Sequence, residues 1–234
     1  MDGNGITGLL SFHWSQLANP VPTRVISEIS TRGQRTCAES GAESVPFDFS
    51  DAIRRLCADI CLRCPTLGHV DVSRLLIGMT PSRTRSRYGL QARITPLRFE
   101  GGRLLRNRRG KLYGLQRYFV GDQEMLYHLT FCVPRFLNQE FHEKLITVFH
   151  ELYHIDPTFN GDLRRHVGRC CLHSHSKREY DERMAVLVRH YLATRPDPQL
   201  HEPLRLTCRQ LMARHGAIKG IAVARPKVIP ISAP

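Results

Sequence analysis

LITVFHELYHIDPTFNGDLRRHVGRCCLHSHSKREYDERM, residues 145–184, contains the segment HELYH. In this segment Glu151 directly follows His150, and His154 stands four residues after His150. Apolar residues recur around this segment at three- and four-residue spacings, which predicts an amphipathic helix over 138–155. Successive helical residues are about 100° apart, so both histidines fall on the side opposite the broad apolar face. We therefore expect a helix that packs on a sheet and presents two imidazoles to a cleft.

Two imidazoles one turn apart can hold a single zinc ion at about 2.0–2.1 Å each. Glu151 lies about 100° around the helix from His150, where it is poorly placed as a further ligand. It is instead expected to take the proton of a zinc-bound water that attacks a carbonyl, and to return that proton to the leaving amine. The competing interpretation is a surface helix whose histidines only pack or cap.

The third metal ligand is less closely specified by the sequence. Pro157 disfavours helix at Asp156, so the helix is expected to end near Ile155 and the chain to turn back through 157–161. His173 is the favoured ligand because it lies just ahead of the next predicted helix. The alternatives are His166 and His175, the thiols of Cys170 and Cys171, and the carboxylates of Glu179, Asp181 and Glu182.

Polar residues near the predicted ligands have two interpretations each. Asp162 or Asp181 could orient a ligand imidazole, although both are also ordinary turn or helix carboxylates. Tyr153 and Tyr180 could stabilise the oxyanion of a tetrahedral intermediate. Tyr180 also begins a helical stripe that is typical of core positions. The stripe consists of Tyr180, Met184, Leu187 and Tyr191.

The chain resembles zincin-type metallopeptidases over roughly 65–184, in particular small members of that class found in phages and bacteria. The similar segments are YGLQARITPLRF, VPRF, EKLITVFHELYHI, GDLRR and HSHSKREYD. SprT-like proteases, which act on proteins attached to DNA, are more distantly similar through the HExxH helix and a later histidine. The resemblance implies a zincin fold in which His150 and His154 are zinc ligands, Glu151 is the general base, and His173 occupies the place of the later histidine.

The remaining segments predict an α+β fold with a small, mostly antiparallel sheet packed on the HExxH helix. A helix over 48–64 with Ser50 as its N-cap comes first, and β-rich runs lie at 73–81, 88–99 and 124–136. A helix follows at 176–194, and 195–203 is a proline-rich break before a short helix and a terminal strand. We expect a loosely ordered lead over 1–44, a metallopeptidase domain over 45–195 and a C-terminal extension over 196–234.

The composition favours a cytoplasmic protein whose basic surface attracts polyanions. The 234 residues carry a net charge of +13, and the N-terminus has neither the basic region nor the apolar run of an export signal. Charges interrupt every apolar run, so no membrane helix is expected, and the eight cysteines are expected to be reduced. Residues 83–111 hold nine arginines and one lysine against Glu100 alone, which is either a DNA- or RNA-binding surface or a solvated basic loop.

Together these features predict a zinc-dependent endopeptidase of protein or peptide substrates. The apolar run 125–133 is the expected edge strand, along which an extended substrate would lie. Two alternatives stay open: a basic nucleic-acid-associated protein with a structural zinc site and no hydrolytic activity, and a metallohydrolase that does not act on peptides. The identity of the substrate, self-processing and the oligomeric state are not specified by the sequence.

Overall fold

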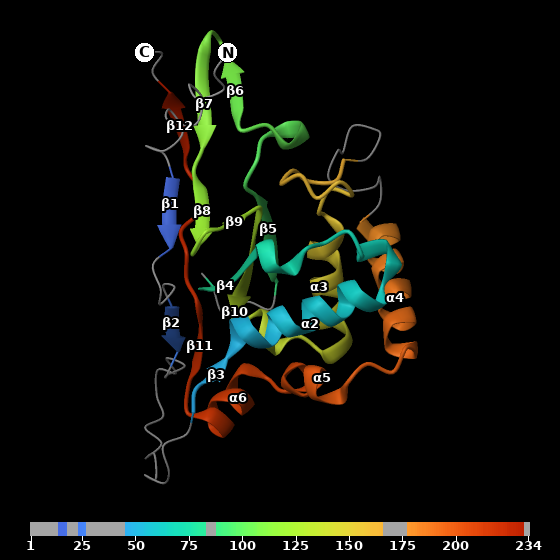
Figure 1. Cartoon of the computed structure of the whole chain (residues 1–234). Helices are drawn as coiled ribbons and strands as arrows, with labels where there is room; N and C mark the ends of the chain where they lie inside the picture. The colour runs from blue at the N-terminus through green and yellow to red at the C-terminus, as the bar shows by residue number, and fades with distance from the viewer. Residues whose placement is uncertain (1–13, 18–22, 27–44, 83–87, 166–176, 232–234) are drawn as a thin grey trace.

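The computed structural model describes residues 14–17, 23–26, 45–82, 88–165 and 177–231, and these form an α+β fold. The helices gather on one face of a sheet, while shorter strands lie on the other side (Figure 1). In this part of the chain no helix combines the length and the apolar character needed to cross a membrane. The predicted α+β class is confirmed.

Six strands form the sheet that supports the helices. They are β2 (Thr23–Ile26), β3 (Phe47–Asp48), β4 (Leu75–Pro81), β5 (Ala92–Pro96), β10 (Tyr127–Val133) and β11 (Ile218–Ile221). Their order is β2-β11-β4-β10-β5, with β3 also paired to β11. The pairs β4–β10, β4–β11 and β3–β11 are parallel, whereas β5–β10 and β2–β11 are antiparallel. The prediction of a mostly antiparallel sheet is therefore wrong for this sheet, which is mixed.

Strand β10 lies inside the sheet between β4 and β5. Its alternate residues Tyr127, Leu129 and Phe131 join the core beneath the helices, and the residues between them belong to the opposite face. Because nearly all of β10 is buried, its sequence is an almost continuous apolar run, as expected of a central strand. The expectation that 125–133 is the edge strand is wrong: β5 has that position beside the motif helix.

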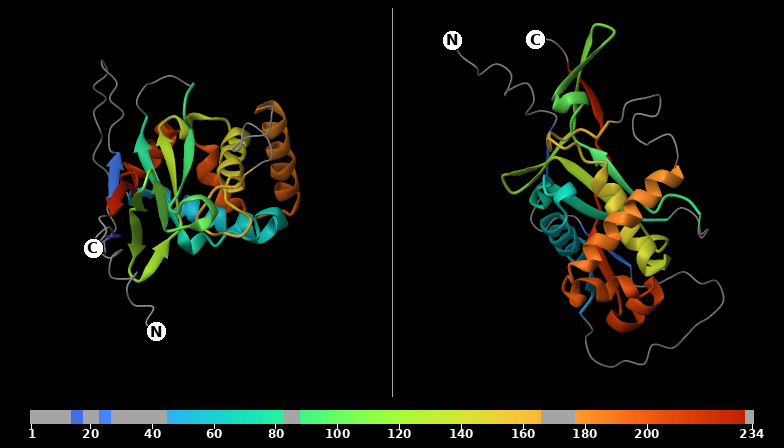
Figure 2. Two further views of the ribbon diagram at one scale, coloured as in Figure 1. Left: turned by 90° about the horizontal axis from the view of Figure 1, so that it is seen from above. Right: turned by 90° about the vertical axis from the view of Figure 1, so that its right-hand side faces the viewer.

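Five α-helices complete the described fold. They are α2 (Phe49–Arg63), α3 (Phe141–Tyr153), α4 (Lys177–Ala193), α5 (Pro198–Arg205) and α6 (Cys208–His215). The 3₁₀ turns are η1 (Pro65–Leu67), η2 (Val72–Arg74), η3 (Glu100–Gly102) and η4 (Phe136–Asn138). Helices α3 and α4 lie side by side, and α3 also packs against β5 (Figure 2).

Helix α2 begins two residues earlier than its predicted cap implies. Asp48 is the N-cap, and its carboxylate accepts a hydrogen bond from the Asp51 amide at 3.0 Å. Ser50 lies inside the helix, where its hydroxyl instead accepts a hydrogen bond from the Ile221 amide at 2.8 Å. The Ser50 prediction is wrong because Asp48 offers a carboxylate at the position where the first free amides of the helix point.

Helix α5 occupies part of the segment predicted as a proline-rich break. Asp197 caps it, and Pro198 stands at its first turn, where a missing amide has no cost. The buried side chain of Lys144, on α3, holds the end of α5 by donating hydrogen bonds to the carbonyls of Leu204 and Leu206, each at 2.8 Å. Burial lowers the pKa of Lys144 to about 8.

Two smaller sheets accompany the six-stranded sheet. One contains β1 (Trp14–Leu17), β8 (Arg117–Val120) and β9 (Gln123–Met125), and the other contains β6 (Leu105–Arg108), β7 (Lys111–Leu115) and β12 (Val228–Ile231). The hairpin β6–β7 extends away from the body of the protein (Figure 2). Its exposed arginines Arg106, Arg108 and Arg109 are called the hairpin arginines below.

Candidate metal centre

Helix α3 carries His150 and Glu151, has His154 as its C-cap, and ends as its sequence predicts. Glu140 and Glu143 form a capping box at its N-terminus. The helix ends at Tyr153, with His154 as C-cap at φ −70° and ψ −13°, before Asp156 and the following proline. The prediction that it stops near Ile155 is confirmed. His150 therefore lies in the last turn, and His154 lies directly after it.

The two histidine side chains converge. The Nε2 atoms of His150 and His154 are 3.0 Å apart, and the ring centroids are 4.7 Å apart with the rings near perpendicular. Two nitrogens at the usual zinc distance and a tetrahedral angle would be about 3.3 Å apart. The pair therefore fits the binding of one zinc ion through both Nε2 atoms, with little movement of either ring.

Glu151 reaches the edge strand β5 from the last turn of α3. Its side chain is 8% exposed, and one carboxylate oxygen accepts a hydrogen bond from the Ile94 amide at 2.7 Å. Burial raises the pKa of Glu151 to about 7, although that hydrogen bond and the positive charge of Arg93 act in the opposite direction. The carboxyl group is thus held in one orientation and has a proton affinity suited to a general base near neutral pH.

Tyr180 covers the histidine pair from α4. Its ring centroid lies 4.7 Å from that of His150, and it stacks on His154 with 5.6 Å between centroids and 20° between planes. Tyr180, Met184 and Tyr191 are all buried, so the predicted core stripe is confirmed. Burial also raises the pKa of Tyr180 well above its usual value, which keeps the phenol protonated. Tyr180 therefore belongs both to the core and to the wall of the candidate centre.

Tyr153 connects the histidine pair to a neighbouring cavity. Its hydroxyl accepts a hydrogen bond from Arg183 at 3.2 Å, and the guanidinium of Arg164 lies 4.1 Å from its ring centroid. These three residues line a cavity of about 500 Å³ that Asp156 and Asp162 also border. Neither Arg164 nor Arg183 was predicted as a site residue. The signal for Arg183 is its place three residues after Tyr180 on one helix, and Arg164 lies in the segment GDLRR that resembles zincin-type sequences.

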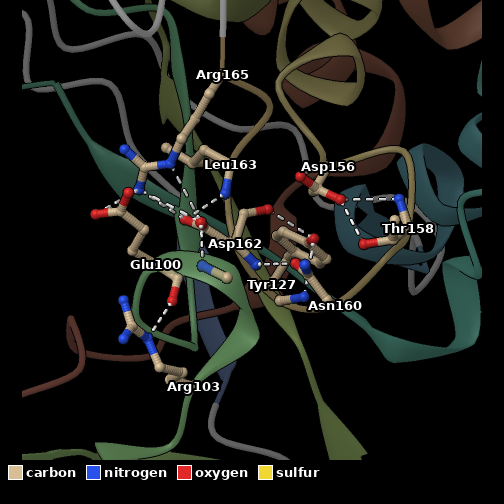
Figure 3. A network of polar contacts seen from close by, with 11 residues as sticks. Glu100, Arg103, Tyr127, Asp156, Thr158, Asn160, Asp162, Leu163 and Arg165 are labelled. Atoms are coloured by element: carbon tan, nitrogen blue, oxygen red, sulfur yellow. Dashed lines mark hydrogen bonds and ion pairs between the residues drawn. The ribbon is translucent and has the colours of Figure 1, made fainter. Parts of the chain in front are cut away.

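A polar network fixes the chain that leaves α3 (Figure 3). The Tyr127 hydroxyl donates to the Asp162 carbonyl at 2.8 Å and accepts from the Gly161 amide at 3.0 Å. The Asp162 carboxylate accepts hydrogen bonds from the amides of Gly101 and Leu163 at 2.9 and 2.8 Å. Asp162 therefore organises this loop from within, and among the contacts of the described residues it does not touch either histidine.

The favoured third ligand, His173, lies outside the described residues, as do His166, His175, Cys170 and Cys171. The side chains of Glu179 and Asp181 are likewise outside the described part, and Glu182 is exposed. Within the described part, no third histidine, cysteine or carboxylate joins the pair.

The chain on each side of 166–176 is anchored at the histidine pair. The amide of Arg164 donates a hydrogen bond to the carbonyl of His154 at 2.7 Å, and Ile155 forms a β-bridge with Leu163. On the other side, Tyr180 stacks on His154. The described chain before residue 166 thus lies against the His154 backbone, and the described chain after residue 176 reaches the two imidazoles at Tyr180.

Comparison with models of protein families, with curated proteins and with solved structures finds no match to this chain.

Proposed function

We propose that the protein is a zinc-dependent endopeptidase of zincin type, with His150 and His154 as zinc ligands and Glu151 as general base. The observation that carries this proposal is the 3.0 Å separation of the two Nε2 atoms beside a buried carboxyl group with a raised pKa. The resemblance of the segments around HExxH to zincin-type metallopeptidases supports it. His173 is proposed as the third ligand from its place between two anchored ends.

Each residue has a separable role in this proposal. Zinc, when bound, supplies a Lewis acid that polarises a water molecule and the carbonyl of the bond to be cleaved. Glu151 accepts the proton of the attacking water and donates it to the departing amine, and the Ile94 amide keeps its carboxylate oriented. The Tyr153 hydroxyl, at the cavity beside the pair, is the proposed donor to the developing oxyanion.

Strand β5 is the proposed binding edge for an extended substrate, in place of 125–133. The Cys132 amide donates to the Gln91 carbonyl, so Gln91 and the alternate residues after it face β10. Ala92 and Ile94 then direct their backbone groups outward, which agrees with the hydrogen bond from Ile94 to Glu151. A peptide added to this edge would lie beside the general base.

The hairpin arginines are the proposed contact to DNA or RNA. All three are exposed on a hairpin that projects from the body, which would let them reach phosphates of a nucleic acid. Arg83, Arg85 and Arg87 of the same basic segment lie outside the described residues. This contact would bring the protease to substrates that are themselves bound to nucleic acid.

Metal analysis combined with a peptide-cleavage assay tests the proposed function. The purified protein is expected to hold close to one zinc, and His150→Ala should lose it because the remaining ligands compete poorly with water. Glu151→Gln should retain zinc and fold while losing cleavage of an unfolded peptide library, because an amide cannot take the proton.

Two matched variants on the same helix serve as controls. His142→Ala removes an exposed histidine from α3 and should leave the zinc content unchanged. Glu143→Gln keeps a side chain that can complete the capping box and should leave cleavage unchanged. Full zinc occupancy in His150→Ala would refute the metal site. Zinc binding without any cleavage by the wild type would favour the structural-zinc alternative.

A further inference from the structure

A second cavity, of about 780 Å³, lies on the face of the sheet opposite the helices. It is formed by β4, β5, β10 and the segment 222–225 that follows β11. Its polar lining includes the guanidinium groups of Arg93, Arg135 and Arg225 and the hydroxyls of Thr95 and Thr130. No carboxylate is found among the described residues that line it. The cavity is thus strongly positive and has the size of a small-molecule site.

The three arginines line the same cavity. Burial raises the pKa of Cys132, and the charges of Arg135, Arg93 and Arg225 each oppose that increase. The charge of Glu151 acts on the same thiol and adds to the increase. Arg135 donates a hydrogen bond to the Leu90 carbonyl at 2.8 Å. Arg93 and Arg225 form no ion pair with any acidic residue in the described part of the chain.

His128 adds a buried nitrogen that lacks a hydrogen-bond partner. Its side chain lines the cavity, is 2% exposed, and places Nε2 3.0 Å from the Thr130 hydroxyl. Nδ1 is buried and has no hydrogen-bond partner within the described residues. A buried polar atom without a partner costs free energy, which a ligand atom can recover. When Nε2 accepts from Thr130, Nδ1 carries the proton and can donate to an anion.

We propose that this cavity binds a phosphate group. Arginine guanidinium groups match the geometry of phosphate oxygens and form paired, charge-assisted hydrogen bonds with them. The Thr95 hydroxyl and the Nδ1–H of His128 would supply neutral donors to the remaining oxygens. The phosphate can belong to a small phosphorylated compound or to the backbone of a nucleic acid. This site is separate from the histidine pair, which lies on the helical side of the sheet, and it does not depend on the proposed peptidase activity.

Isothermal titration with pyrophosphate tests the site directly. The wild type is expected to bind about one pyrophosphate per chain, and Arg225→Ala should weaken the affinity at least about tenfold, since one charge-assisted hydrogen bond is lost. Arg225 suits this test because it is exposed and lies outside the helices and strands. Arg209→Ala removes an exposed arginine from α6 with the same change in net charge, and it should bind like the wild type.

A single-stranded oligonucleotide, dT10, distinguishes the two sources of phosphate. Binding of dT10 that pyrophosphate displaces and Arg225→Ala weakens would identify a nucleic-acid backbone as ligand. Pyrophosphate binding without such displacement would identify a small phosphorylated compound. The proposal is overturned if the wild type does not bind pyrophosphate at low salt, or if Arg209→Ala weakens binding as much as Arg225→Ala.

Discussion

His128 should make the protein less stable as the pH falls from 7 to 5. Burial, assisted by the charge of Arg225, lowers the pKa of His128 to about 4. A histidine in an unfolded chain has a pKa of about 6.5. Between these values the unfolded chain binds more protons than the folded protein, so protons favour unfolding. The stabilisation is fully present above about pH 6.5 and is lost as the pH falls toward 4.

The size of the effect follows from the two pKa values. They give a loss of about 2 kcal/mol in the free energy of unfolding between pH 7 and pH 5, and about 3 kcal/mol when the titration is complete. Urea denaturation of the wild type and of His128→Gln at pH 7, 6 and 5 measures it, because glutamine does not titrate. Other histidines, including His69 and His201, contribute equally to both proteins and cancel in the comparison.

A matched variant makes the result specific to the buried position. His142 is exposed on α3, so His142→Gln should lose as much stability between pH 7 and pH 5 as the wild type does. The reasoning is refuted if His128→Gln and the wild type show the same pH dependence. That outcome would mean that His128 is protonated as easily in the folded protein as in the unfolded chain.

Two further predictions concern the anchor of α5 and the basic hairpin. Lys144→Met leaves the carbonyls of Leu204 and Leu206 without their buried donor, so thermal or urea unfolding should show a loss of about 1–3 kcal/mol for each carbonyl that water does not reach. The exposed Lys227→Met should change stability little, and equal losses in both variants would contradict the anchoring role. Replacing the hairpin arginines by alanine should make the affinity for duplex DNA less dependent on salt. The slope of log affinity against log salt concentration should fall by the amount that up to about three phosphate contacts contribute, and the zinc content should stay unchanged. An unchanged slope in a gel-shift titration would show that the hairpin is a solvated surface.

The motif helix could be predicted because its signals are local. The apolar spacing defines its buried face, the four-residue spacing brings His150 and His154 together, and Pro157 sets its end. The hydrogen bond between Glu151 and Ile94 could not be predicted, because it depends on which strand forms the edge of the sheet. That order results from pairings between distant segments, for which a single sequence holds no periodic signal.

The wrong predictions for the edge strand and for the starts of α2 and α5 have physical reasons. An apolar run such as 127–133 indicates burial on both faces, and this property belongs to a central strand and not to an edge. The caps of α2 and α5 show the other type of error. Asp48, and not Ser50, is the N-cap of α2. Pro198 begins α5 because, in the first turn, its ring has no helical carbonyl to clash with and its missing amide leaves no hydrogen bond unmade. The third ligand stays a prediction, since His173 lies outside the described residues.

The place of β11 has a consequence for how the protein is made. Ile221 pairs with Gly78, so one edge of β4 stays unpaired until the ribosome has added residue 221. Until then β4, β10, β5 and α3 can assemble, but they expose a strand edge that attracts other extended chains. Pairing between such distant residues also slows folding, since a long loop must close first. A nascent or truncated chain that ends before 218 should therefore depend on chaperones, even though every residue of the histidine pair and its base has already been synthesised.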